Sequence, residues 1–239
     1  MIEKKEMVGK GADTVISLVH NYFENHGLGE KYVVIHADNC TGQNKNNAMI
    51  KYLAWRVMNG LHTKIIYSFM VAGHTKFSPD GFFGLFKLKL HHSEVDTLED
   101  LAQVVKDLTA SGYNIPQLIV NNDERRVNFF NWTEFLYNYF DGVPNILKQH
   151  HFSFSQDKLG QATIKTAENG PEKEVNLVWH NQASPAADAF PTQKQAIGLS
   201  PEHQWYLYEE VRMHIQDHSK HDIYCPLPQV PKPKRKPKE

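Results

Sequence analysis

This sequence has few cysteines, no long apolar run and no marked excess of one charge, and each of these absences excludes a class of protein. The chain has two cysteines, Cys40 and Cys225, which are too few for a disulfide framework or a cysteine-rich zinc site. No run approaches the roughly 18 apolar residues of a membrane-spanning helix, and the amino terminus lacks the apolar core of a signal peptide. We therefore expect an intracellular protein with no membrane partner.

Net charge is also small. The 26 basic and 27 acidic residues nearly cancel, so the whole chain lacks the strongly basic balance of most DNA-binding modules. Basic residues gather instead in the final PKPKRKPKE, where prolines oppose helix and sheet formation. We expect residues 218–239 to form a disordered, Pro/Lys-rich basic tail. Three interpretations of this tail stay open: a nuclear address, a phosphate-contacting arm, or a solvated terminus.

Helical and strand-like apolar patterns alternate in the first half of the chain. In chain order they predict a helix at 13–26, a strand at 32–37, a helix at 45–58, a strand at 64–71, and helices that begin at Ser78 and Thr97. Gly27, Gly60 and Gly112 follow three of these helices, and we expect each to end its helix in the left-handed conformation. This alternation is typical of an α/β fold.

The second half has a different pattern. Short strand-like runs lie at 116–120, 125–130, 150–154, 161–166 and 174–179, with an aromatic helical stretch at 132–140 and a late helix from Pro201 to about 216. We interpret this half as a β-rich elaboration of the α/β core.

The polar segment 36–46, HADNCTGQNKN, is the first candidate site. It places Asp38 at the carboxyl end of a hydrophobic strand, where ligand sites of α/β sheets gather. Asn39, Gln43 and Lys45 are nearby candidates for contacts with nucleic-acid phosphates. Carboxylate and amide oxygens also suit hard divalent cations. The alternative is that Asp38 or Asn39 caps a turn and Asn44 caps the next helix.

A second polar segment, GHTKFSPD at 73–80, also follows a hydrophobic strand and also ends in a carboxylate. If the two strands are neighbours, Asp38 and Asp80 are expected within about 8 Å of each other, close enough to hold shared or paired metal ions. His74 then becomes a catalytic candidate that orients a water or donates to a phosphate oxygen, and Lys76 a candidate phosphate contact. The alternatives are a first-turn carboxylate that stabilises the helix dipole and a hydrogen-bonded loop histidine.

The joint pattern HADNCxGQNKNN, a WRVM-bearing helix and GHTKFSPDxFFGLFK resembles an uncharacterised domain of transposon-derived animal proteins, related to DDE-type transposases. The resemblance covers most of residues 8–155, and GLSPEHQWYLYEEVR resembles the carboxyl-terminal helix of that family. It implies an RNase H-like core, Mg²⁺ or Mn²⁺ as cofactor, and DNA as partner. Asp38 then matches the second catalytic carboxylate and Asp80 the third.

The resemblance also implies what is missing. The chain begins at about the first core helix, so the three leading strands and their catalytic Asp are absent. We therefore expect three regions: a partial RNase H-like domain at 8–155, a β elaboration and helix at 156–217, and the basic tail.

The sequence thus predicts a transposon-derived, intracellular protein, nuclear if the basic tail is an address, whose DDE-type core has lost strand cleavage and transfer. One alternative is a self-contained divalent-metal phosphoesterase that uses His36, Asp38, Asn39, His74 and Asp80. The other is a domesticated interaction protein without enzymatic activity, in which both polar loops are caps.

Overall fold

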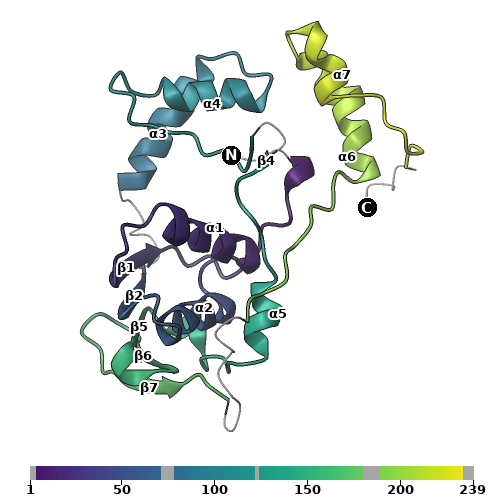
Figure 1. Ribbon diagram of the computed structural model, residues 1–239. Helices are drawn as coiled ribbons and strands as arrows, with labels where there is room; N and C mark the ends of the chain where they lie inside the picture. Colours follow the sequence, from purple (N-terminus) through teal and green to yellow (C-terminus); the bar gives the residue numbers. More distant parts are fainter. Residues whose placement is uncertain (1–3, 71–77, 122–123, 180–188, 234–239) are drawn as a thin grey trace. The chain divides into compact units, whose positions relative to one another are not determined.

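The computed structural model describes residues 4–70, 78–121, 124–179 and 189–233 (Figure 1). The chain divides into two compact units, each built from separate stretches of sequence. The sheet unit comprises Val8–Lys76 and Val127–Gln195. The helical unit comprises Met1–Met7, Phe77–Arg126 and Ala196–Glu239.

A mixed five-stranded sheet forms the centre of the sheet unit, with strand order β1-β2-β5-β6-β7. The strands are β1 (Tyr32–Ala37), β2 (Lys64–Phe69), β5 (His151–Ser155), β6 (Gln161–Lys165) and β7 (Lys173–Asn176). β1 and β2 are parallel, and every later neighbour pair is antiparallel. The parallel pair is joined by a helix, the usual crossover between parallel neighbours. Both strands therefore end at the same edge of the sheet.

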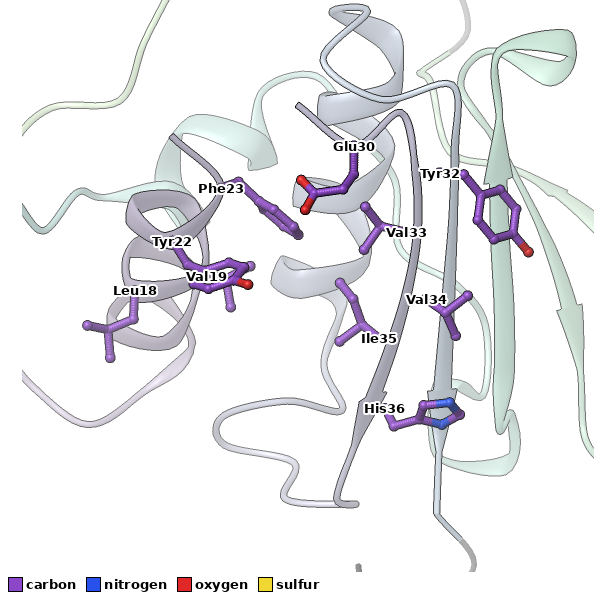
Figure 2. Close-up of a pocket in the computed structure, with 10 residues that line it drawn as sticks. All are labelled: Leu18, Val19, Tyr22, Phe23, Glu30, Tyr32, Val33, Val34, Ile35 and His36. Carbon is purple, nitrogen blue, oxygen red and sulfur yellow. The ribbon is translucent and has the colours of Figure 1, made fainter. Parts of the chain in front are cut away.

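Helices cover one face of this sheet. They are α1 (Ala12–Asn25), α2 (Asn47–Met58) and α5 (Trp132–Tyr137). The unit also contains two short 3₁₀ turns, η2 (Ile146–Lys148) before β5 and η3 (Gln156–Lys158) between β5 and β6. Figure 2 shows Val33 and Ile35 of β1 directed toward α1, on the covered face.

Alternation along β5 shows which face is covered: Phe152 and Phe154 are buried, whereas Ser153 between them is only partly covered. The buried phenylalanines join Leu53 and Trp132 in one hydrophobic core. α/β architecture is thus confirmed, and the predicted β-rich elaboration extends the same sheet.

The helical unit contains the remaining elements. They are η1 (Lys4–Glu6), α3 (Ser78–His91), α4 (Leu98–Lys106), β3 (Val120–Asn121), β4 (Glu124–Arg125), α6 (Pro201–Tyr206), the π-helical turn η4 (Leu207–Val211), η5 (Arg212–His214), η6 (His218–Lys220) and α7 (His221–Tyr224). Thr97 caps α4 through a capping box with Asp100, in which each side chain accepts from the other residue's backbone N–H. Ser200 caps α6, whose first residue is Pro201.

The compact units differ from the three regions expected from the sequence. β5 and β6, on either side of the predicted boundary at 155, are hydrogen-bonded neighbours in one sheet. Residues 218–224, assigned to the basic tail, form η6 and α7, because Asp217 accepts from the Ser219 backbone and Arg212 forms an ion pair with Asp222. No helix within the described ranges is both long and apolar enough to cross a membrane.

Candidate functional site

Asp38 follows β1 directly and organises the loop that leads to α2. Its Oδ1 accepts from the Cys40 backbone N–H at 3.0 Å and from Asn44 Nδ2 at 2.7 Å. The Cys40 carbonyl in turn accepts from three successive backbone N–H groups, those of Gln43, Asn44 and Lys45. These bonds form a tight, self-supporting turn. The Asp38 side chain remains exposed at the end of the sheet.

The helix cap differs from the predicted one. Asn46, rather than Asn44, accepts the Met49 backbone N–H at 3.1 Å, so α2 begins at Asn47. The Asn44 side chain donates to Asp38 instead, and the Asn44 backbone carbonyl accepts from the Tyr67 hydroxyl at 3.1 Å. Burial raises the pKa of Tyr67, and the nearby Asp38 carboxylate raises it further. Tyr67 therefore remains a neutral hydrogen-bond donor beneath the Asp38 loop.

Asn39 and Lys45 point inward and connect the ends of β1 and β2. Asn39 Nδ2 donates to the Met70 carbonyl, just after β2, and Asn39 Oδ1 accepts from Lys45 Nζ at 2.9 Å. Lys45 is only 3% exposed, and its ammonium lies 5.0 Å from the centre of the Phe69 ring. Burial lowers its pKa. Among the described residues no carboxylate forms an ion pair with Lys45, so an amide oxygen and an aromatic face are its partners.

His150 and His151 also lie near the edge where β2 ends. His151 Nδ1 and Ser68 Oγ share a hydrogen bond at 3.0 Å. Register places His36, Ser68, His151 and Lys165 in one row across four strands. His150 is the neighbour of His151, and its Nδ1 is buried without a hydrogen-bond partner. Burial lowers the pKa of both histidines, and the Lys45 charge lowers that of His150 further.

Strand register brings this row together. The register cannot be read from the sequence before the strand order is known, so the sequence gives no signal for the row. Adjacent residues of a strand point to opposite faces, so His150 and His151 cannot bind one metal ion together as a pair.

The remaining predicted residues divide between the two units and the undescribed segments. Gln43 is exposed and its Nε2 donates to the Lys10 carbonyl at 3.2 Å, which attaches the Asp38 loop to the segment before α1. Asp80 lies in the first turn of α3, as expected, but α3 belongs to the helical unit. His74 and Lys76 lie outside the described residues. The expected proximity of Asp38 and Asp80 therefore stays a prediction.

The donor set that the structure does describe is sparse for a metal centre. Within the described residues no group of three or more His, Cys, Asp or Glu side chains is arranged to hold a metal ion. One oxygen of Asp38 is already committed to two donors of its own loop. Mg²⁺ takes six oxygen ligands in near-octahedral geometry, so this set does not fit a protein-caged ion or a metal pair.

Comparison with known families gives one result for the chain. Residues 6–171 match the model of a domain of unknown function, DUF7869. This match covers more than half of the chain. The chain belongs to the DUF7869 family. No curated protein and no solved structure matches it significantly.

The DUF7869 match includes both polar segments, since Asp38 and Asp80 lie within it. It begins just before α1 and ends after β6, and so crosses both compact units. The segment 198–212, which resembles a family carboxyl-terminal helix, lies outside the matched residues.

Proposed function

We propose that this chain is a transposon-derived protein whose sheet unit is a partial RNase H-like core of the DDE-transposase type. In this proposal the core keeps weak affinity for a divalent cation and for DNA but has lost strand cleavage and transfer. The resemblance of the HADNCxGQNKNN and GHTKFSPD segments supports the family relationship. The parallel β1-α2-β2 arrangement, with Asp38 at the carboxyl end of β1, is compatible with such a core.

One observation carries the proposal: an exposed carboxylate is held in a fixed position where two parallel strands end. Two hydrogen bonds to Oδ1 hold the Asp38 side chain in one orientation. Its other carboxylate oxygen, Oδ2, therefore also has a fixed position. Ligand sites of α/β sheets form at this edge. Asn39 also donates to the carbonyl of Met70, the residue that follows β2, at the same edge. A hydrated cation bound there would contact Asp38 and several waters.

The proposed loss of catalysis follows from the donor set. Metal-assisted phosphoryl transfer needs ions placed to activate the nucleophile and to stabilise the leaving oxygen. Among the described residues the site offers one exposed carboxylate, Asp38, and one of its oxygens already accepts two hydrogen bonds, so these residues alone do not place an ion to that precision. Lys45, which is close in sequence, is buried with Asn39 and Phe69, so its role in the described structure is to organise the loop.

The test is a Mn²⁺ titration followed by paramagnetic broadening of backbone amide signals. We expect signals of residues 38–45 to broaden at millimolar Mn²⁺ and this broadening to disappear in Asp38→Asn. Asp157→Asn is the matched control, because Asp157 is also an exposed carboxylate in the turn after a strand, β5. The control should broaden like the unmodified chain.

Three results are informative. Broadening at residues 38–45 that requires Asp38 supports the proposal. No broadening there favours a non-enzymatic interaction protein in which the Asp38 loop is only a cap. Tight binding with hydrolysis of a phosphodiester favours the self-contained phosphoesterase.

A further inference from the structure

The segment that follows α7 returns to α6 and contacts it. Trp205 Nε1 of α6 donates to the Val230 carbonyl at 3.0 Å. Lys232 Nζ forms an ion pair with Glu209 of η4, the π-helical turn that continues α6, and lies 5.5 Å from the centre of the Trp205 ring. Because Lys232 contacts both side chains, Trp205 and Glu209 lie on one side of this helical stretch.

A packed group of side chains supports Trp205. Tyr208 meets Trp205 edge to face, with ring centres 6.1 Å apart and an angle of 89° between the rings. The Arg212 guanidinium lies 5.4 Å from the centre of the Tyr208 ring, and Arg212 Nη1 donates to Asp222 Oδ1 at 2.6 Å and to the Cys225 carbonyl at 2.8 Å. Cys225 is buried and directly follows α7. The same interactions therefore fix the aromatic rings and the point from which the returning segment starts.

The two residues of this segment that contact α6 and η4 each precede a proline. Pro231 follows Val230, and Pro233 follows Lys232. Proline holds its own φ near about −65° and restricts the preceding residue to extended conformations. The segment therefore loses little conformational entropy when it docks. Aromatic-lined grooves of other proteins recognise proline-rich segments for this reason.

Each contact of this segment is weak, so docking is reversible. The Lys232 and Glu209 side chains are 51% and 36% exposed, and salt screens an ion pair at such exposure. A single hydrogen bond and one partly hydrated cation–π contact add little more. Residues 226–233 form no helix or strand, so no backbone ladder holds them in place. The docked and released states are therefore close in free energy.

Charge explains the ion pair and what would break it. Glu210 is a second exposed carboxylate beside Glu209, and Arg212, the next basic residue of this stretch, already pairs with Asp222. The sequence from Lys232 onward, KPKRKPKE, is strongly basic. An anionic polymer that binds this basic sequence therefore competes with Glu209 for Lys232.

We propose that Trp205, Tyr208 and Glu209 form a recognition site for a Val-Pro-Lys-Pro segment, and that the chain's own residues 230–233 occupy this site as a reversible latch. The closed latch binds Lys232 in competition with anionic polymers. An anionic polymer that takes Lys232 opens the latch. This latch does not depend on the proposed ancestry or on metal binding.

The first measurement is the mobility of the latch in the full chain, from ¹⁵N relaxation of the Val230 and Lys232 amides at low salt. Trp205→Phe keeps an aromatic ring but removes the N–H donor, and Glu209→Gln removes the charge that attracts Lys232. We expect both variants to increase the mobility of these amides, and added salt to do the same in the unmodified chain. Glu210→Gln is the matched control, because it removes the neighbouring charge and should leave the latch closed. Circular dichroism establishes that each variant is folded.

A peptide tests recognition separately from the covalent link. The probe is the capped peptide Leu-Pro-Gln-Val-Pro-Lys-Pro, a copy of residues 227–233. In the Lys232→Glu chain, Glu209 repels the chain's own segment and the site is open. We expect the peptide to bind this chain at least about tenfold more tightly than the unmodified chain, in which the linked segment competes at a high effective concentration. Replacing the peptide lysine by glutamate should weaken binding at least about tenfold.

Single-stranded DNA serves as the anionic probe. Trp205→Phe changes no charge, so a gain in affinity for a labelled oligothymidylate reports the release of Lys232. We expect a gain of at least about twofold at low salt, from one additional phosphate contact. This gain should disappear when Lys232→Gln is already present, so Lys232→Gln and Lys232→Gln/Trp205→Phe should bind the oligonucleotide equally.

Any of three results overturns the proposal. The first is equal mobility of the Val230 and Lys232 amides in the unmodified chain and in Trp205→Phe. The second is a peptide that fails to bind the Lys232→Glu chain, or that binds it equally well with glutamate in place of lysine. The third is an oligonucleotide affinity that Trp205→Phe leaves unchanged, because the contact with α6 would then not compete for Lys232.

Discussion

At the scale of single residues, Lys45 shows how a charge can be buried without a carboxylate partner. A buried ammonium normally needs an ion pair or several hydrogen bonds, because removing it from water is costly. Here its partners are Asn39 Oδ1 and the face of Phe69. Asn39 also donates to the Met70 carbonyl, so one amide serves both a buried cation and the strand end beside it.

We therefore predict that Asn39→Ala lowers the free energy of unfolding by about 1–3 kcal/mol, the typical cost of leaving buried polar groups unsatisfied. Chemical denaturation measures this change. Gln43→Ala is the control, since Gln43 is exposed, and its effect should be much smaller. The double variant Asn39→Ala/Lys45→Met also removes the Lys45 ammonium, which Asn39→Ala leaves without its acceptor, and should recover part of the lost free energy of unfolding. A double variant less stable than Asn39→Ala would show that Lys45 is not the group that needs Asn39.

At the scale of elements, a buried polar network joins α1 to α2. Arg56 of α2 is 3% exposed, and its Nη2 forms an ion pair at 3.0 Å with Glu24 of α1. Its Nε donates to His62 Nδ1 at 3.2 Å, and Nη1 donates to the Tyr52 hydroxyl at 3.1 Å and lies 3.1 Å from His20 Nδ1. Burial, reinforced by the Arg56 charge, lowers the pKa of His20 and of His62 to about 4.

This network should make stability depend on pH. Because the folded pKa values lie below the unfolded value of about 6.5, the unfolded chain takes up protons first as pH falls. The stabilisation is fully present above about pH 6.5 and is lost as pH falls toward about 4. We predict that the free energy of unfolding decreases by roughly 2–4 kcal/mol between about pH 7 and pH 5.

Urea unfolding across this pH range measures the decrease. His20→Asn/His62→Asn keeps an acceptor for Arg56 but cannot titrate, so its stability should vary much less with pH. His92→Gln, a change at an exposed histidine of the helical unit, should leave the pH dependence unchanged. If the free energy of unfolding of the double asparagine variant falls as steeply with pH, other groups cause the pH dependence. His150 and His151 are then the next candidates.

Local elements could largely be predicted from the sequence. β1 occupies the predicted 32–37, and α1 and α2 lie within two residues of the predicted helices. Gly60 and Gly112 take the left-handed conformation, but Gly27 does not. Gly27 is required for a different reason, since a Cβ there would lie 2.8 Å from the Phe23 carbonyl oxygen. Helical spacing locates a helix end without specifying how the backbone leaves it.

At the scale of the whole molecule, pairing between distant segments could not be predicted. Periodicity predicts that residues 150–154 form a strand but contains no information that β5 pairs with β2 rather than with a nearer partner. The same limit applies to the site. Asp38 was identified because it follows a hydrophobic strand, whereas Ser68 and His151 meet only through the β2–β5 register. The inward direction of Lys45 depends on packing against Phe69, which sequence spacing does not encode.

This chain should show neither nuclease nor strand-transfer activity. A cation held by Asp38 and water alone is neither positioned nor constrained enough to activate a nucleophile and stabilise a leaving oxygen at the same time. We therefore expect no cleavage or transfer of labelled duplex or single-stranded DNA by the purified chain in Mn²⁺, even where Mn²⁺ broadening shows that the ion binds. Asp38→Ala is the control, because any activity of this site needs that carboxylate. Cleavage by the unmodified chain that disappears in Asp38→Ala would overturn the inactive-transposase proposal. It would also show that groups beyond the described residues complete the metal site, and the self-contained phosphoesterase would then become the better explanation of the Asp38 loop.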